Sequence, residues 1–150
     1  MISGEQTTEI AAGPEAVYAI VSDLERYPEW QEFLQRVTVR ERDGEGRPVL
    51  VEAEADATVR TLRIELRCTR EPPRRVAWRS EGGDLKEMMG AFDLAEAGPG
   101  RTRATFRLDV DPGRKLGLLL RGALADRLRD HVLGGMLDGL RRRAESGAPA

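Results

Sequence analysis

Cys68 and His131 are the only cysteine and the only histidine of this 150-residue chain, and both are residue types that can do nucleophilic or acid–base chemistry. A hydrolase-type nucleophile needs a serine or cysteine beside a histidine, and a third group that orients the histidine. Cys68 alternates with Ile64 and Leu66 in a strand-like segment, so we expect a small buried hydrophobic side chain. His131 lies near the apolar stripe of a helical segment, where it could move a proton or bind a ligand carbonyl, although a satisfied or partly exposed helix histidine is the simpler interpretation. The sequence therefore predicts no catalytic triad, and we assign no catalytic residue.

Two cations interrupt the inward-facing positions of the strand-like segments. Arg60 shares the parity of Leu62 and Ile64, and Lys86 shares the parity of Met88. Each lies near a strand end and is a candidate for the mouth of a ligand pocket, where it would pair with a carboxylate, phosphate or enolate. The alternative is a solvated residue whose alkyl stem covers the surface.

The composition argues against several classes of function. Lys and Arg total 24 against 26 for Asp and Glu, a formal net charge of −2, so no net basic field favours nucleic acid. A single cysteine and a single histidine leave no metal cluster and no internal disulfide. No Walker loop or glycine-rich dinucleotide fingerprint is present, so we expect no cofactor. Without a membrane-spanning apolar run or a signal peptide, we expect a cytoplasmic protein that makes no stable membrane insertion.

The hydrophobic periodicity predicts the order of the elements. A first strand over 3–10 precedes a helix that opens at Pro14. Tyr27-Pro28 ends that helix and begins a second short one through Trp30, Phe33 and Leu34. Strict alternation then favours strands from residue 36 to 110, separated by turns too short for helical crossovers. After Asp111-Pro112-Gly113 one long helix is expected to reach Arg143.

Period-two alternation indicates a sheet with one buried and one solvated face, which the long helix must cover. Small inward residues leave room for a cavity between helix and sheet: Ala53, Ala55, Ala57, Gly90 and Ala104. Direct packing of these positions against large helix side chains is the alternative that periodicity leaves open. On the cavity hypothesis, Gly90→Phe should block ligand binding and leave the fold largely intact.

Several segments resemble the START-like, or SRPBCC, superfamily, which includes the polyketide cyclase/dehydrase and coenzyme Q-binding families. The resemblance rests on the entry segment from Ile10 to Trp30 (IAAGPEAVYAIVSDLERYPEW), on Gly90 to Glu96, and on the Gly98-Pro99-Gly100 hairpin with the strand that follows it. It covers residues 3–143 and implies an α+β helix-grip fold. In that fold a curved seven-stranded antiparallel sheet, with two short helices after the first strand, wraps around a long C-terminal helix and encloses a deep hydrophobic pocket. We expect a single domain over 1–144 and a flexible tail over 145–150.

Functionally, this combination favours a carrier that binds a lipid, quinone or polyketide in the cavity, mainly by apolar burial. The alternative is a polyketide aromatase/cyclase or dehydratase, although the third strand lacks the inward arginine and serine that such enzymes carry. A protein-interaction module such as a ribosome-directed toxin is a third possibility, and the oligomeric state is left open. A pocket with converging polar groups would favour the enzyme, and an apolar pocket would favour the carrier. The residues expected to contact the ligand are Trp30, Phe33, Arg60, Leu62, Ile64, Leu66, Trp78, Lys86, Met88, Gly90, Phe92, Phe106, Leu120, Leu124 and His131.

Overall fold

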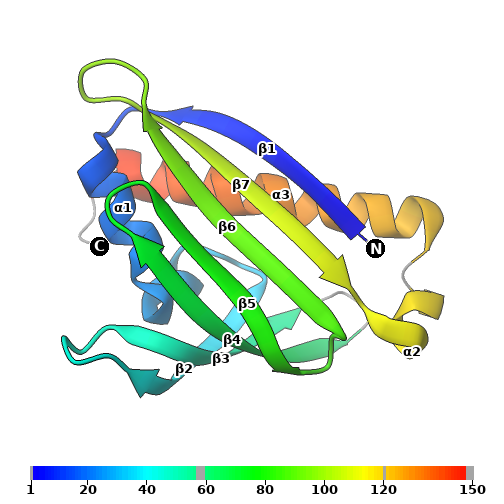
Figure 1. Cartoon of the computed structure of the whole chain (residues 1–150). Helices are drawn as coiled ribbons and strands as arrows, with labels where there is room; N and C mark the ends of the chain where they lie inside the picture. Colours follow the sequence, from blue (N-terminus) through cyan, green and yellow to red (C-terminus); the bar gives the residue numbers. More distant parts are fainter. Residues whose placement is uncertain (1, 57–59, 120, 148–150) are drawn as a thin grey trace.

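The computed structural model describes residues 2–56, 60–119 and 121–147, and it contains one curved antiparallel sheet with a long helix across one face (Figure 1). The strands are β1 (Ile2–Ile10), β2 (Leu34–Arg42), β3 (Pro48–Asp56), β4 (Thr61–Glu71), β5 (Arg75–Gly83), β6 (Glu87–Glu96) and β7 (Thr102–Asp111). Their order in the sheet is β1-β7-β6-β5-β4-β3-β2, so the first strand pairs with the last and β1 and β2 form the edges.

The helices are α1 (Pro14–Ser22), the 3₁₀ helix η1 (Leu24–Glu29), α2 (Gly113–Leu119) and α3 (Gly122–Glu145). With two short helices after β1, seven antiparallel strands and a long C-terminal helix, the predicted helix-grip architecture is confirmed. In Figure 1, α3 runs behind β1 and β7, while β2 and β3 curl away at the other side of the sheet.

Local chemistry accounts for the first two helices. Pro14 occupies the first turn of α1, where its missing N–H costs no helical hydrogen bond, and Val17, Ile20 and Val21 form the buried stripe. The second helix is shorter than the sequence predicted, because η1 ends at Glu29 and the chain is already extended at Leu34.

The strands alternate as the sequence predicted, which β4 illustrates. Leu62, Ile64, Leu66 and Cys68 are buried on the inner face. On the outer face the guanidinium of Arg67 lies 2.6 Å from a Glu81 carboxylate oxygen, an ion pair across neighbouring strands. One face of the sheet is therefore available to form a core or a cavity.

The C-terminal helix differs from the expectation of one uninterrupted rod. Arg121 is extended, with φ −129° and ψ 153°, and Gly122 adopts a φ of +58° in the left-handed region that favours glycine. The chain therefore turns a corner between α2 and α3. The predicted single stripe is split as a result, so that Leu116 is buried while Leu124 is 44% exposed.

No helix among the described residues is long and apolar enough to cross a membrane. The last helix continues one residue beyond the expected domain boundary. Its final residue, Glu145, accepts a hydrogen bond of 2.9 Å from the backbone N–H of Ala11, which follows β1. The end of α3 is therefore tied to the turn that follows β1.

Candidate functional site

Two adjoining hollows lie between the inner face of the sheet and α3. The inner chamber has a cavity volume of about 70 Å³, and the outer chamber has one of about 110 Å³. They share part of their walls, namely Phe33, Ala55, Ile64, Met88, Leu108 and Val132. Each chamber exceeds the space that one water molecule requires, which is on the order of 10–15 Å³. The space between helix and sheet is thus partly empty.

The wall of the inner chamber is apolar throughout. Besides the shared residues it consists of Leu24, Tyr27, Leu34, Val37, Val51, Ala53, Leu66, Trp78, Phe106 and Met136. The Tyr27 hydroxyl is already occupied, because it donates a hydrogen bond to the backbone carbonyl of Val21. The Trp78 indole nitrogen lies against Gly90 of the neighbouring strand and presents no polar surface to the chamber.

Charged residues occur only at the outer chamber. Asp56 and Arg129 join its otherwise apolar wall, which adds Ile2, Leu62, Leu85, Val110 and Leu128 to the shared residues. Arg129 also pairs with Asp126 and Asp130, at 3.5 and 3.1 Å.

The small inward residues contribute unequally to this space. Ala53 and Ala55 line the chambers, whereas the room beside Gly90 is filled by the indole of Trp78 on the neighbouring strand. A β-carbon placed on Gly90 would lie 2.5 Å from the Trp78 Nε1 atom. The expectation that Gly90→Phe spares the fold is therefore wrong, because the added ring would have to displace a buried tryptophan. Ala57 lies outside the described residues.

Seven of the residues expected to contact a ligand do line the chambers: Phe33, Leu62, Ile64, Leu66, Trp78, Met88 and Phe106. Phe92 shares their face of the sheet but lies in solid core, with its ring centroid 4.8 Å from that of Phe106. Trp30 is buried against Tyr27, at 4.6 Å between ring centroids, and lines neither chamber.

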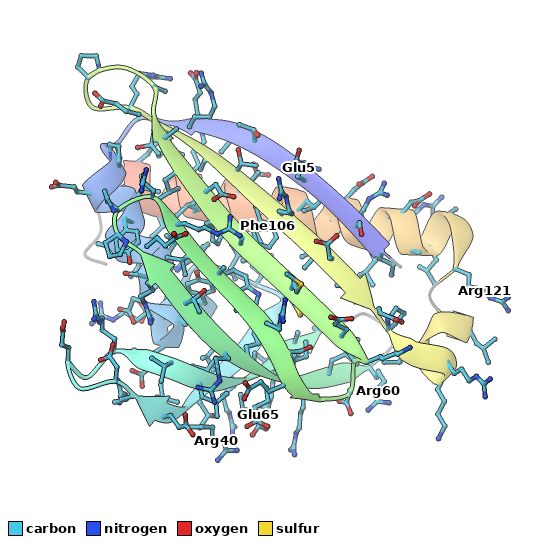
Figure 2. All side chains as sticks on the ribbon, viewed as in Figure 1. Glu5, Arg40, Arg60, Glu65, Phe106 and Arg121 are labelled. Carbon is cyan, nitrogen blue, oxygen red and sulfur yellow. The ribbon has the colours of Figure 1, made fainter. Side chains whose placement is uncertain are left out.

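The polar and helical candidates lie elsewhere. Arg60 is exposed near the end of the sheet (Figure 2) and pairs with Asp84 at 3.5 Å. Lys86 is exposed and pairs with Asp111 at 3.7 Å. Both cations gain a carboxylate partner on the surface instead of facing the cavity. His131 and Leu124 are exposed on α3 and line neither chamber, and Leu120 lies outside the described residues.

Cys68 is buried, as the sequence predicted, with 4% of its surface exposed. Burial raises the pKa of the Cys68 thiol, and the positive charge of Arg70 opposes this only in part. The group is therefore a protonated thiol at neutral pH and a poor nucleophile.

Several cavity residues were missed because they are ordinary apolar residues. Val132 and Met136 follow Leu128 on α3 at four-residue spacing and close the chambers from the helix side. The helical period was a usable signal for all three. Nothing in the sequence distinguished this segment from the more exposed part of the same stripe.

Comparison with known families gives a match over residues 1–145 to the one described as polyketide cyclase/dehydrase and lipid transport. The chain belongs to this family. Its apolar chambers between sheet and helix lie where the resemblance of the sequence to the START-like superfamily implies a hydrophobic pocket. No curated protein matches the chain.

Solved structures agree with this family membership at the level of the fold. A START superfamily protein from Mycobacterium smegmatis is similar with a TM-score of 0.84 and 22% identity, covering 96% of this chain and 97% of its own. A protein from Thermus thermophilus is similar with a TM-score of 0.83 and 23% identity, covering 96% of this chain and 97% of its own. An aromatase/cyclase from Streptomyces sp. R1128 is similar with a TM-score of 0.71 and 20% identity, covering 97% of this chain and 98% of its own. At such identities these likenesses establish the helix-grip fold and leave the ligand of this family member open.

Proposed function

We propose that this protein binds a hydrophobic small molecule, a lipid, quinone or polyketide, between the sheet and α3 and carries it without changing it. The observation that supports this is the inner chamber, whose wall offers no charged side chain. Proton transfer requires an acid or base within hydrogen-bond reach of the substrate, and of the two chambers only the outer one has charged residues, Asp56 and Arg129, in its wall. Binding without chemistry needs only apolar burial, worth about 25 cal/mol per Å².

The chambers are smaller than the 300–1,000 Å³ typical of ligand pockets, so a complete lipid or quinone requires the wall to move. Met88 and Met136 face this space from opposite sides, one from the sheet and one from the helix. Methionine is unbranched and can repack at low cost, which allows the chambers to merge and enlarge around a guest.

The first experiment identifies the ligand. Freshly purified protein is analysed by native mass spectrometry and then extracted with organic solvent. A co-purifying hydrophobic species of unchanged structure supports a carrier. Incubation of the protein with that species and analysis for new products then tests for catalysis, and conversion would contradict the proposal in favour of the aromatase/cyclase alternative.

Ala55→Leu tests the location of the site. Ala55 lines both chambers, so the larger side chain fills empty space and should lower the affinity for the extracted compound by at least about tenfold. Because the volume is available, unfolding free energy should change by no more than about 1 kcal/mol. Ala95→Leu is the matched control, since Ala95 is exposed on β6 and should leave affinity unchanged. Equal affinity of all three proteins would contradict the assignment of the chambers.

A further inference from the structure

The corner formed by α2 and the first turns of α3, residues 113–119 and 121–129, combines exposed leucines with a group of cations. Leu118 is 66% exposed and Leu124 is 44% exposed; Met89 is the only other large hydrophobic residue of comparable exposure in the described part of the chain. Isolated exposed leucines need no explanation. These two belong to consecutive helices that meet at one end of the molecule (Figure 1).

The charge of this α2–α3 corner is opposite to that of the whole chain. Residues 113–129 carry five basic residues and one acidic residue, Asp126, whereas the complete chain has a formal net charge of −2. Among the described residues, no carboxylate lies within ion-pair distance of Arg114, Lys115, Arg121 or Arg127. By contrast, arginines on the outer face of the sheet, such as Arg67 and Arg107, are paired with glutamates.

The corner is continuous with the cavity. Leu124, Leu128, Val132 and Met136 follow one another at four-residue spacing along α3, which places them on one stripe. Their exposure falls along this stripe, from 44% at Leu124 to 3% at Met136, and the intermediate Leu128 and Val132 line the outer chamber. An apolar path thus leads from the surface of the corner into the space between helix and sheet.

We propose that the α2–α3 corner docks on an anionic lipid surface, with Leu118 and Leu124 in the interfacial region and the surrounding cations on the headgroups. Short helical segments with apolar and basic residues bind in this way without spanning the bilayer. Arg121 lies at the outer end of the corner and points away from the sheet, where it would meet a headgroup first (Figure 2). Nucleic acid would use the cations but gain nothing from the leucines.

This proposal rests on the proposed carrier function, because docking would place the outer chamber beside the source of a hydrophobic ligand. Experiments can contradict the docking proposal and the carrier proposal independently of each other. Ala55→Leu should lose ligand binding and keep vesicle binding, whereas a variant of the corner should lose vesicle binding and keep its affinity for ligand in solution.

The test is co-sedimentation of the full chain with vesicles of phosphatidylcholine alone or mixed with phosphatidylglycerol. We expect binding to the mixed vesicles that weakens as salt is raised. The double substitution R114E/K115E should lower the partition coefficient at least about tenfold, since each basic residue near such a surface contributes roughly a fivefold factor. The double substitution R74E/R79E is the matched control: both residues are exposed, no carboxylate is within ion-pair distance of them in the described chain, and the change of net charge is the same.

Leu118→Ser tests the apolar contribution without changing charge, and Met89→Ser on the outer face of the sheet is its control. Leu118→Ser should weaken vesicle binding several-fold, and Met89→Ser should not. Absence of wild-type binding to the anionic vesicles overturns the proposal, as does an equal loss in the corner and control variants. Binding to a DNA duplex without binding to vesicles also overturns the proposal. A dimer that the Leu118→Ser change dissociates overturns it as well, because the α2–α3 corner would then bind a second copy of the chain.

Discussion

The indole of Trp78 lies directly against Gly90, its partner across β5 and β6, so closely that a β-carbon on Gly90 would be 2.5 Å from Nε1 and 2.7 Å from Cε2. The absence of a side chain at Gly90 lets the tryptophan lie flat on the neighbouring strand. There it contacts Phe92 and Phe106, with 5.9 Å between ring centroids in each case. The pair therefore fixes one wall of the inner chamber.

Gly90→Ala should displace the Trp78 ring and lower the free energy of unfolding by about 1–3 kcal/mol, the usual cost of overpacking a core. Urea denaturation gives the stability, and tryptophan fluorescence reports the change in the environment of the ring. A stability within about 0.5 kcal/mol of wild type, with an unchanged emission spectrum, would contradict the close packing of this pair.

Gly139 is required where α3 passes the loop after η1. A β-carbon there would lie 2.3 Å from the backbone oxygen of Trp30 and 2.7 Å from the Gln31 side-chain nitrogen. That nitrogen is held in place, since it donates a 3.0 Å hydrogen bond to the carbonyl of Met136. Gly139→Ala should therefore lower the free energy of unfolding by about 2 kcal/mol or more, because a backbone atom cannot rotate away as a flexible side chain can.

Gly134→Ala and Gly135→Ala are controls on the same helix. Their added methyl groups would meet the nearest atom at 3.8 Å, an ordinary van der Waals contact. Because alanine has the higher helix propensity, both should be neutral or stabilising by up to about 1 kcal/mol in thermal or urea unfolding. If Gly139→Ala behaved like its two neighbours, the close approach of loop and helix would be wrong.

The sheet was predictable because hydrophobic and polar residues alternate with a period of two, and a strand with this pattern has only one face that can be buried. The alternation placed Ile64, Leu66 and Trp78 on the correct side. It did not say how far along that side the cavity extends, and Phe92, with the same parity, lies in solid core. Parity identifies a face, whereas an empty volume depends on which strands and helices meet over it.

Glycine was the least predictable residue. Gly122 turns the chain between α2 and α3, while Gly134, Gly135 and Gly139 continue the helix. Only the first has a positive φ, a property of the backbone that the residue type permits but does not require. The role of Gly90 depends equally on a partner twelve residues away, which sequence spacing does not reveal.

Arg70 is an inward-facing cation that sequence analysis passed over, and it joins three segments. Its guanidinium donates to the carbonyl of Ser22 at the end of α1, at 2.7 and 3.2 Å, and to that of Pro48 at the start of β3, at 2.6 Å. Arg70→Met keeps the stem but leaves both acceptors without this donor, so unfolding free energy should fall by about 1–3 kcal/mol.

Arg74→Met is the matched control for Arg70, because Arg74 is exposed on the turn before β5 and should change stability by less than about 0.5 kcal/mol. Chemical denaturation of the two variants distinguishes the loss of the Arg70 hydrogen bonds from a general effect of removing positive charge. Equal stabilities would show that the three hydrogen bonds contribute little.

Alkaline pH should destabilise the fold through Tyr27. Burial raises the pKa of its hydroxyl well above the ordinary value of 10.0, so the folded protein keeps a proton that the unfolded chain releases above that pH. Burial also raises the pKa values of Tyr18 and of Cys68, whose ordinary values are 10.0 and 9.0. Stability from these groups is thus complete below about pH 9 and falls as the pH rises through and beyond 10.

Tyr27→Phe separates the contribution of this hydroxyl. The variant should be less stable by about 1 kcal/mol at neutral pH, since it loses the hydrogen bond to the carbonyl of Val21, but its stability should fall less steeply above pH 10. Urea unfolding over a series of alkaline pH values measures both effects. Tyr18→Phe, at a less deeply buried tyrosine, should leave most of the alkaline decline in place. An unaltered slope in Tyr27→Phe would mean that other groups cause the decline, and that the Tyr27 hydroxyl is not protected from ionisation by the fold.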